Sequence, residues 1–591
     1  METNNKYTWD TTKFCTNQAE FDERVTKITS LVSQIAKYKG KLGQKESLRE
    51  YLMLDDQLSD MLEAPFMWAH CATDVDVTDA KQNANQHKLE VLSSQIGQEQ
   101  SFATPEILSQ PDSFFDDIIN DDQFLPWRQT FRILKQQKKH VLNDEQQKIV
   151  SALSPIMESF TKTFSSCVYG DIKFGKIMDS KGVEHELTNT NYQFVLEDPD
   201  RTLRKNATER YFEVHGHYLN TLTANLNAQV QRNTIMAKLY HYPTVFDSAS
   251  SGLNIDRAFY DKFMVNVQPF FKLYKRFNDL RLKTIAKQYG IKDLKEYDAG
   301  LPIGKKLENI SFEQALEKVK NALSILGKDY ITQIERAVNE RWIDVYPSAN
   351  KFSGGYSSSI HGYSPVILLN WENSLDDVYT LAHELGHAIR HVYCGETGYR
   401  EAPQTAMFVD ETFSTTNQVL LYRYLVENEK NKDAKIYILS EYISNLLHYL
   451  SSVLDSKCED YLYTKMLQNT PASKDEILEY TKSVYACIQS DIISERHSSV
   501  RTLVMFHYYS LPYYVWQYTC GILNANFIAN NILKGDSAYV DKYLQFLSSG
   551  SMYPLDALKI VDIDYNTQDV FDAMRAELNM RIDQLEKLLN E

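Results

Sequence analysis

Hydrophobic positions recur at helical spacing along most of the chain. The pattern is continuous from Phe312 to Leu326 and from Leu439 to Leu467, and it returns near the end at Leu578, Ile582 and Leu585. Residues spaced in this way fall on one face of an α-helix, which buries that face and exposes the opposite one. The sequence therefore predicts a mainly α protein.

Segments with the pattern of a β-strand are few. We expect strands at 192–196 and at 365–371. Residues 1–190 have the pattern of helical hairpins with polar turns, so we expect an N-terminal helical lobe over 1–190 and a larger second domain over 191–591. In the larger domain, the glycines and proline of 300–304 predict a loop or hinge.

Composition narrows the classes of function. The chain has 591 residues, 43% of them hydrophobic, and a net charge of −16. Such an acidic protein is repelled by nucleic acid and by anionic membranes, so we expect neither as a partner. The sequence has no apolar run long enough to span a bilayer, and we expect no secretory signal. The seven cysteines are odd in number and form no Cys-x-x-Cys pair, which favours reduced thiols and a soluble, cytoplasmic protein.

A candidate metal-binding motif lies in the second half of the chain. His383 and His387 are four residues apart and Glu384 follows the first, which is the HExxH pattern of zinc peptidases. On a helix, residues at i and i+4 project from the same face and can bind one ion. Glu384 would take the proton of a water molecule. Asp376 and Asp377 favour a helix start just before the motif, although a chance match is the alternative.

A third ligand is expected from a second helix. Glu411 lies downstream in a segment whose apolar residues recur as they do on a packed helix. Two residues compete with it: Asp410 on a neighbouring face, and His391 on the first helix. His391 lies about 12 Å along the helix axis from His383, too far to share an ion at ligand distances of ~2 Å. Glu411 is therefore the predicted ligand.

Several segments in the same order carry a family resemblance. They are Lys6 to Asp10, Glu340 to Tyr346, Val366 to Trp371, Thr380 to Ala388, Glu411 to Thr415 and Tyr553 to Asp556. Together they resemble oligoendopeptidase F, which belongs with thimet oligopeptidase among the zinc oligopeptidases. The resemblance covers nearly the whole chain.

The resemblance implies both a fold and a site. The fold would be a two-lobed helical one, with a deep central channel and a small β-sheet near the active site. His383, His387 and Glu411 correspond to the ligands of one zinc ion per chain, and Glu384 corresponds to the general base. Gln418 stands where many relatives carry an acid.

A second candidate group lies in the aromatic segment 506–521. Negative charge develops on the carbonyl oxygen when an amide is hydrolysed, and hydrogen-bond donors placed there lower the barrier. The segment resembles the family's run of histidine and tyrosine donors, with His507 and either Tyr513 or Tyr514 as candidates. The alternative for any one of these aromatic residues is packing in the core.

The segment before the motif is a candidate substrate platform. Residues 351–363 form a loop rich in small residues, and the strand expected at 365–371 follows it. An edge strand there could pair with the backbone of an extended peptide. Gly355, His361 and Tyr363 are candidate substrate contacts, whereas a plain hairpin is the alternative.

These patterns predict a zinc endopeptidase that hydrolyses internal bonds of short peptides, with the oligomeric state left open. A zinc carboxypeptidase or dipeptidase on a similar scaffold is an alternative from the same class of enzyme. A non-catalytic, peptide-binding relative is an alternative from another class, although its mark would be a missing ligand or base.

Overall fold

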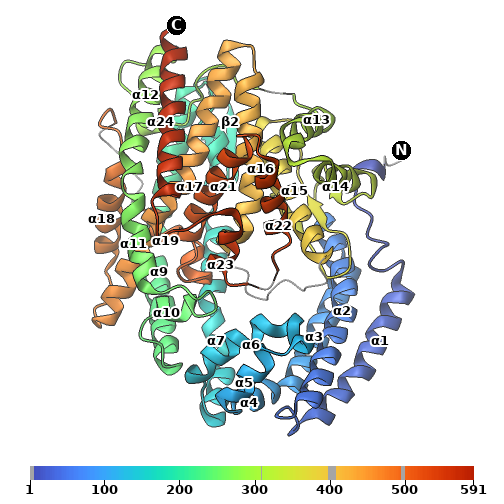
Figure 1. The fold of residues 1–591 in the computed structure, drawn as a ribbon. Helices are drawn as coiled ribbons and strands as arrows, with labels where there is room; N and C mark the ends of the chain where they lie inside the picture. The colour runs from blue at the N-terminus through green and yellow to red at the C-terminus, as the bar shows by residue number, and fades with distance from the viewer. Residues whose placement is uncertain (1–4, 308, 397–406, 494–499, 551) are drawn as a thin grey trace. The chain divides into compact units, whose positions relative to one another are not determined.

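The computed structural model describes residues 5–307, 309–396, 407–493, 500–550 and 552–591 (Figure 1). Helices account for 72% of the chain and the sheets are small, so the predicted mainly α class is confirmed. None of the described helices has the length and the apolar run that a membrane crossing requires.

The chain forms two compact units, each assembled from three separate segments. Unit 1 contains 1–139, 308–424 and 528–564, and unit 2 contains 140–307, 425–527 and 565–591. Neither unit coincides with 1–190 or 191–591, and the predicted domain boundary near residue 190 stays a prediction.

Unit 1 consists of helices and a three-stranded sheet. Its helices are α1 (Gln18–Ile35), α2 (Lys45–Val75), α3 (Ala80–Gln100), α4 (Ala103–Leu108), α5 (Asp112–Ile119), α6 (Arg128–Gln137), α13 (Phe312–Leu323), α14 (Lys328–Asn339), α15 (Leu375–Glu396), α22 (Ser537–Leu547) and α23 (Pro554–Leu558). Most of α16 (Met407–Asn428) also belongs to unit 1. The strands are β3 (Ile343–Asp344), β4 (Tyr356–Ser358) and β5 (Val366–Leu368).

Unit 2 is built on long helices and one β-hairpin. Its helices are α7 (Asp144–Ser165), α8 (Tyr192–Val195), α9 (Arg201–Leu239), α10 (Val245–Ser250), α11 (Arg257–Val267), α12 (Phe270–Tyr289), α17 (Lys432–Leu467), α18 (Lys474–Tyr485), α19 (Arg501–Val504), α20 (His507–Ser510) and α24 (Asp569–Asn590), together with most of α21 (Trp516–Ile532). The hairpin pairs β1 (Gly175–Met178) with β2 (Glu184–Leu187).

One of the two predicted strands forms and the other does not. Residues 192–196 contain the short helix α8 instead of a strand, because Tyr192 stacks on Tyr211 of α9, a contact that the local pattern does not encode. The strand expected at 365–371 does form as β5, but it is the central strand of its sheet, parallel to β3 and antiparallel to β4. The edge strands are β3 and β4, so the expectation that 365–371 offers a free edge is wrong.

The loop at 300–304 is firmly anchored within unit 2. The Arg281 guanidinium of α12 donates to the carbonyls of Ala299 and Leu301, and the Tyr289 hydroxyl donates to Pro302. A Cβ on Gly304 would lie 2.4 Å from the carbonyl oxygen of Asp433, so the loop backbone packs directly against α17. These contacts fit a loop better than a hinge.

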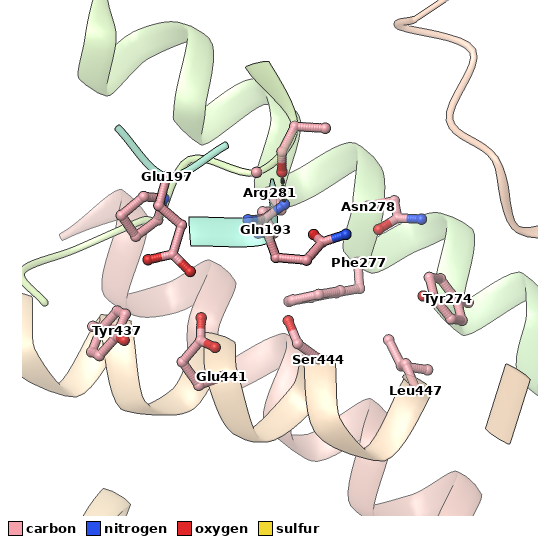
Figure 2. A pocket seen from close by; sticks show the side chains of 13 residues that line it. Gln193, Glu197, Tyr274, Phe277, Asn278, Arg281, Tyr437, Glu441, Ser444 and Leu447 are labelled. Atoms are coloured by element: carbon pink, nitrogen blue, oxygen red, sulfur yellow. Dashed lines mark hydrogen bonds between the residues drawn. The ribbon is translucent and has the colours of Figure 1, made fainter. Parts of the chain in front are cut away.

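The anchored loop forms one wall of a polar pocket of about 320 Å³ in unit 2 (Figure 2). Glu197 and Glu441 point toward one another across it, and Arg281 lies beside them. Glu197 is paired with Lys306 at 2.6 Å. Acidic and basic side chains therefore lie together in and beside the pocket.

Candidate metal centre

Helix α15 forms where the sequence predicts it. Ser374 and Asp377 cap its first turn: the Asp377 carboxylate accepts the Ser374 N–H at 2.8 Å, and the Ser374 hydroxyl accepts the Asp377 N–H at 3.1 Å. Leu381 and Leu385 are fully buried on the core face. The helix is thereby fixed at its start and along one side, which sets the direction of the histidines on it.

His383, His387 and Glu411 converge in unit 1. The Nε2 atoms of the two histidines are 3.2 Å apart, and Glu411 Oε2 lies 3.5 Å from His383 Nε2. Ligands at ~2.0–2.1 Å from a tetrahedral zinc ion are about 3.4 Å from one another. The observed separations match that spacing. Within the described part of the chain, these three residues are the one group of histidine, cysteine or acidic side chains with metal-ligand geometry.

Two polar residues of α16 orient the candidate ligands. Gln418 Oε1 accepts a hydrogen bond from His383 Nδ1 at 3.2 Å, which leaves Nε2 of the ring for an ion. The Ser414 hydroxyl donates to Glu411 Oε2 at 3.0 Å. From the sequence, Gln418 was noted only as a departure from relatives. Ser414 was missed, although its position one turn after Glu411 could have indicated a hydrogen bond to that carboxylate.

Close packing of α15 and α16 brings the ligands together (Figure 1). Gly386 faces α16, and a Cβ there would lie 2.6 Å from the Cα of Ser414. The Asn417 amide donates to the carbonyl of Ala382 at 3.1 Å and accepts from the Tyr330 hydroxyl at 2.8 Å. The glycine of the motif therefore permits an approach that any side chain would block, and buried hydrogen bonds lock it.

Glu384 lies beside the histidines and is 6% exposed. Burial raises its pKa to about 7; His383 opposes the rise, Glu411 adds to it, and the Ser357 N–H of β4 opposes it by hydrogen bonding to the carboxylate. A carboxyl group with a pKa near neutrality can both accept and return a proton.

The two alternatives to Glu411 as a ligand, His391 and Asp410, lie outside the metal-ligand group. His391 hydrogen-bonds the carbonyl of Ile360 at 3.1 Å. The Tyr363 ring packs on Phe14 with centroids 5.5 Å apart.

Gly355 and His361 flank the edge strand β4. A Cβ on Gly355 would lie 2.9 Å from the Thr380 side chain, so this backbone passes close to α15. The His361 N–H lies 3.3 Å from the Glu63 carboxylate. A role of Gly355, His361 or Tyr363 in substrate binding stays a prediction.

The aromatic candidates belong to unit 2, and the structure separates the two tyrosines. Tyr513 is buried and its hydroxyl donates to Asp460 at 2.7 Å. The half-buried Tyr514 instead stacks on His507, with ring centroids 5.4 Å apart and 16° between the planes. Burial lowers the pKa of His507, Arg501 also lowers it and Asp455 opposes the shift, so the ring is neutral near pH 7 and can donate one N–H.

A mainly helical chain with a histidine pair, a nearby glutamate and an adjacent buried acid has the features of a metallopeptidase. Comparisons agree: residues 194–577 match the model of peptidase family M3, and residues 106–174 match that of Oligopeptidase F. The chain belongs to peptidase family M3, and it is a metallo-oligopeptidase.

Relatives match over almost the full chain. Oligopeptidase PepF of Bacillus subtilis is 26% identical over 98% of this chain and 87% of its own length. The group B oligopeptidase PepB of Streptococcus agalactiae is 28% identical over 99% of this chain and 97% of its own length. The crystal structure of oligoendopeptidase-F from Enterococcus faecium has a similar fold, with a TM-score of 0.73 and 22% identity over 97% of this chain and 99% of its own.

Proposed function

We propose that the protein is a zinc-dependent endopeptidase that cuts internal bonds of short peptides. The observation that carries the proposal is the convergence of His383, His387 and Glu411, with the buried Glu384 next to them. Two imidazoles and a carboxylate at this spacing are the donor set of catalytic zinc sites, which leave one position for water or substrate. The names of the relatives, oligopeptidase and oligoendopeptidase F, support short peptides as substrates.

In this proposal each side chain of the site has a separate role in amide hydrolysis. A zinc ion held by the three ligands would acidify water and polarise the scissile carbonyl. Glu384 accepts a proton from the attacking water and gives it to the leaving amine. His507 and Tyr514 donate hydrogen bonds to the carbonyl oxygen as negative charge develops on it. Tyr513 is a weaker candidate, because its hydroxyl already donates to Asp460.

The test compares Glu384→Gln with Glu577→Gln. Both acids are almost fully buried, at 6% and 5% exposure, but Glu577 lies in α24 and hydrogen-bonds Tyr442 and Arg581. The Glu384 variant should bind one zinc ion per chain and lose cleavage of a quenched peptide, because it keeps the ligands and lacks the base. The Glu577 variant should cleave normally. Near-normal kcat in Glu384→Gln would refute the assignment of the base.

The peptide used in this test has both ends blocked, which separates the alternatives. Internal cleavage requires an endopeptidase, whereas a carboxypeptidase or dipeptidase would leave the peptide intact. Binding without cleavage would instead indicate a peptide-binding protein. The predicted cytoplasmic location stays a prediction.

A further inference from the structure

Tyr513 has an unusual backbone conformation. Its φ angle is +54°, in the left-handed region that disfavours a residue with a Cβ. Outliers of this kind persist only where the surrounding structure over-determines them, and they gather at functional sites. The residues that hold Tyr513 therefore indicate what the strained conformation is for.

Two neighbouring acids of α17 hold Tyr513. Glu459 Oε1 accepts the Tyr513 N–H at 2.9 Å, and Asp460 accepts its hydroxyl at 2.7 Å. The ring also stacks on Tyr463 and meets Tyr260 edge-on, with centroids 5.4 and 5.8 Å away. Backbone, hydroxyl and ring are each fixed, so Tyr513 has little freedom to relax.

Glu459 is a buried acid whose position lowers the stability of the fold. It is 2% exposed, and its Oε2 has no hydrogen-bond partner among the residues that the structure describes. Burial raises its pKa to about 8, so the carboxyl group is mostly protonated near neutral pH. A buried acid with one oxygen unpaired lowers stability. The hydrogen bond that this carboxyl group does make, at Oε1, is the one from the Tyr513 N–H.

That segment carries the two groups proposed to bind the carbonyl oxygen. Left-handed Tyr513 lies in the turn between α20 and α21, and the ring of the next residue, Tyr514, stacks on His507. Tyr518 meets both rings edge-on, at 6.0 and 5.7 Å. Asp455, one turn before Glu459 on α17, binds Arg501 through two hydrogen bonds of 2.8 and 2.9 Å. Acids of α17 thus anchor the chain on both sides of His507.

We propose that Glu459 is a positioning residue: by accepting the N–H of the left-handed Tyr513, it fixes Tyr514 against His507 in the arrangement that binds the developing oxyanion. The inference rests on the proposed function of His507 and Tyr514. Glu459 itself does not touch the substrate. Its effect reaches the reaction through the backbone of residue 513.

The experiment compares three substitutions of buried acids. Glu459→Met removes the acceptor at nearly constant volume, Glu459→Gln retains an acceptor oxygen, and Glu577→Met is a control that removes a buried acid of α24. We expect Glu459→Met to lower kcat by about 10- to 100-fold with little change in KM, because misplacement by ~1 Å has effects of that size. Glu459→Gln should restore kcat to within about threefold, and Glu577→Met should reduce thermal stability without lowering kcat.

A spectroscopic readout accompanies the kinetics. In Glu459→Met the imidazole proton resonances of His507, assigned by their loss in His507→Ala, should shift, because the stacked Tyr514 ring moves. They should stay in place in Glu577→Met. Zinc content should equal that of the wild type in every variant, since the ligands are unchanged. If Glu459→Met does not fold, Glu459→Ala, which removes the same acceptor without adding an apolar chain, should lower kcat and shift the same resonances relative to a Glu577→Ala control.

The outcomes distinguish the positioning role of Glu459 from the proposed role of His507 and Tyr514 as oxyanion donors. Equal kcat in Glu459→Met and the Glu577→Met control, or unshifted His507 resonances, would overturn the positioning role. If Glu459→Met does not fold, unchanged kcat and unshifted His507 resonances in Glu459→Ala would overturn it in the same way. Unchanged kcat in both His507→Ala and Tyr514→Phe would instead overturn the proposed oxyanion donors, and the positioning role with them.

Discussion

Replacing Gly386 by alanine tests whether the approach of α15 to α16 creates the metal centre. The new Cβ would lie 2.6 Å from Ser414 Cα and 2.9 Å from the Phe413 carbonyl oxygen. Carbon atoms pack best at about 3.5–4.0 Å, so the two helices must separate by about 1 Å. Both clashing groups are backbone, and neither can rotate away.

The separation acts directly on the ligands. Glu411 would move from His383, whose Nε2 now lies 3.5 Å from its Oε2. Disturbing the partners of metal ligands costs about 10- to 100-fold in affinity, so displacing a ligand should raise the zinc Kd by at least about 10-fold. At saturating zinc, kcat/KM should fall by about 100-fold. Overpacking should lower the free energy of unfolding by about 1–3 kcal/mol, offset by up to about 1 kcal/mol of improved helix propensity.

A matched control exists on the same helix. Gly395 of α15 is exposed, and a Cβ there would meet nothing within 4 Å. Gly395→Ala should keep full activity and zinc affinity and gain up to about 1 kcal/mol of stability. Zinc Kd from competition with a chromogenic chelator, peptide cleavage and thermal unfolding are measured on both variants. Wild-type zinc affinity in Gly386→Ala would show that close packing of the helices is not what assembles the site.

Three further predictions concern the residues around the site. Gln418→Leu, which removes the acceptor from His383 Nδ1, should weaken zinc binding by about 10- to 100-fold, and Gln418→Glu should bind zinc at least as tightly as the wild type. Equal zinc Kd values for Gln418→Leu and the wild type in chelator competition would contradict this. Tyr514→Phe should lower kcat by about 100-fold and Tyr513→Phe by less, because only the Tyr514 hydroxyl is proposed to reach the substrate; steady-state kinetics that rank them the other way would reverse the assignment. Glu459, with a pKa raised from 4.5 to about 8, keeps a proton that the unfolded chain releases, so stability should decline as pH rises from about 5 to 8, by up to about 5 kcal/mol. Glu459→Gln should flatten this decline in thermal unfolding measured across that pH range, and identical slopes would argue against the raised pKa.

The sequence by itself determined the helical class and the identity of the candidate ligands. The spacing of His383 and His387 fixes their relation on any α-helix, since successive turns place i and i+4 on one face. Excluding His391 needed only the rise per residue. Glu411 required more than spacing, because its helix could have packed in other orientations. For Glu411, two observations together favoured a ligand role: an acid in an apolar, helical segment, and the resemblance to a known family.

Tertiary structure decided what depends on residues far apart in the chain. Strand order placed β3 and β4 at the edges and β5 at the centre, which no local pattern reveals. Contact with α17 distinguished Tyr513, whose hydroxyl is taken by Asp460, from Tyr514, whose ring meets His507. The partners of the ligands, Gln418 among them, follow from how closely α15 and α16 pack. Local periodicity specifies which face a helix buries, but the distance and rotation between two helices come from side chains that meet only after folding, and those determine the site's geometry.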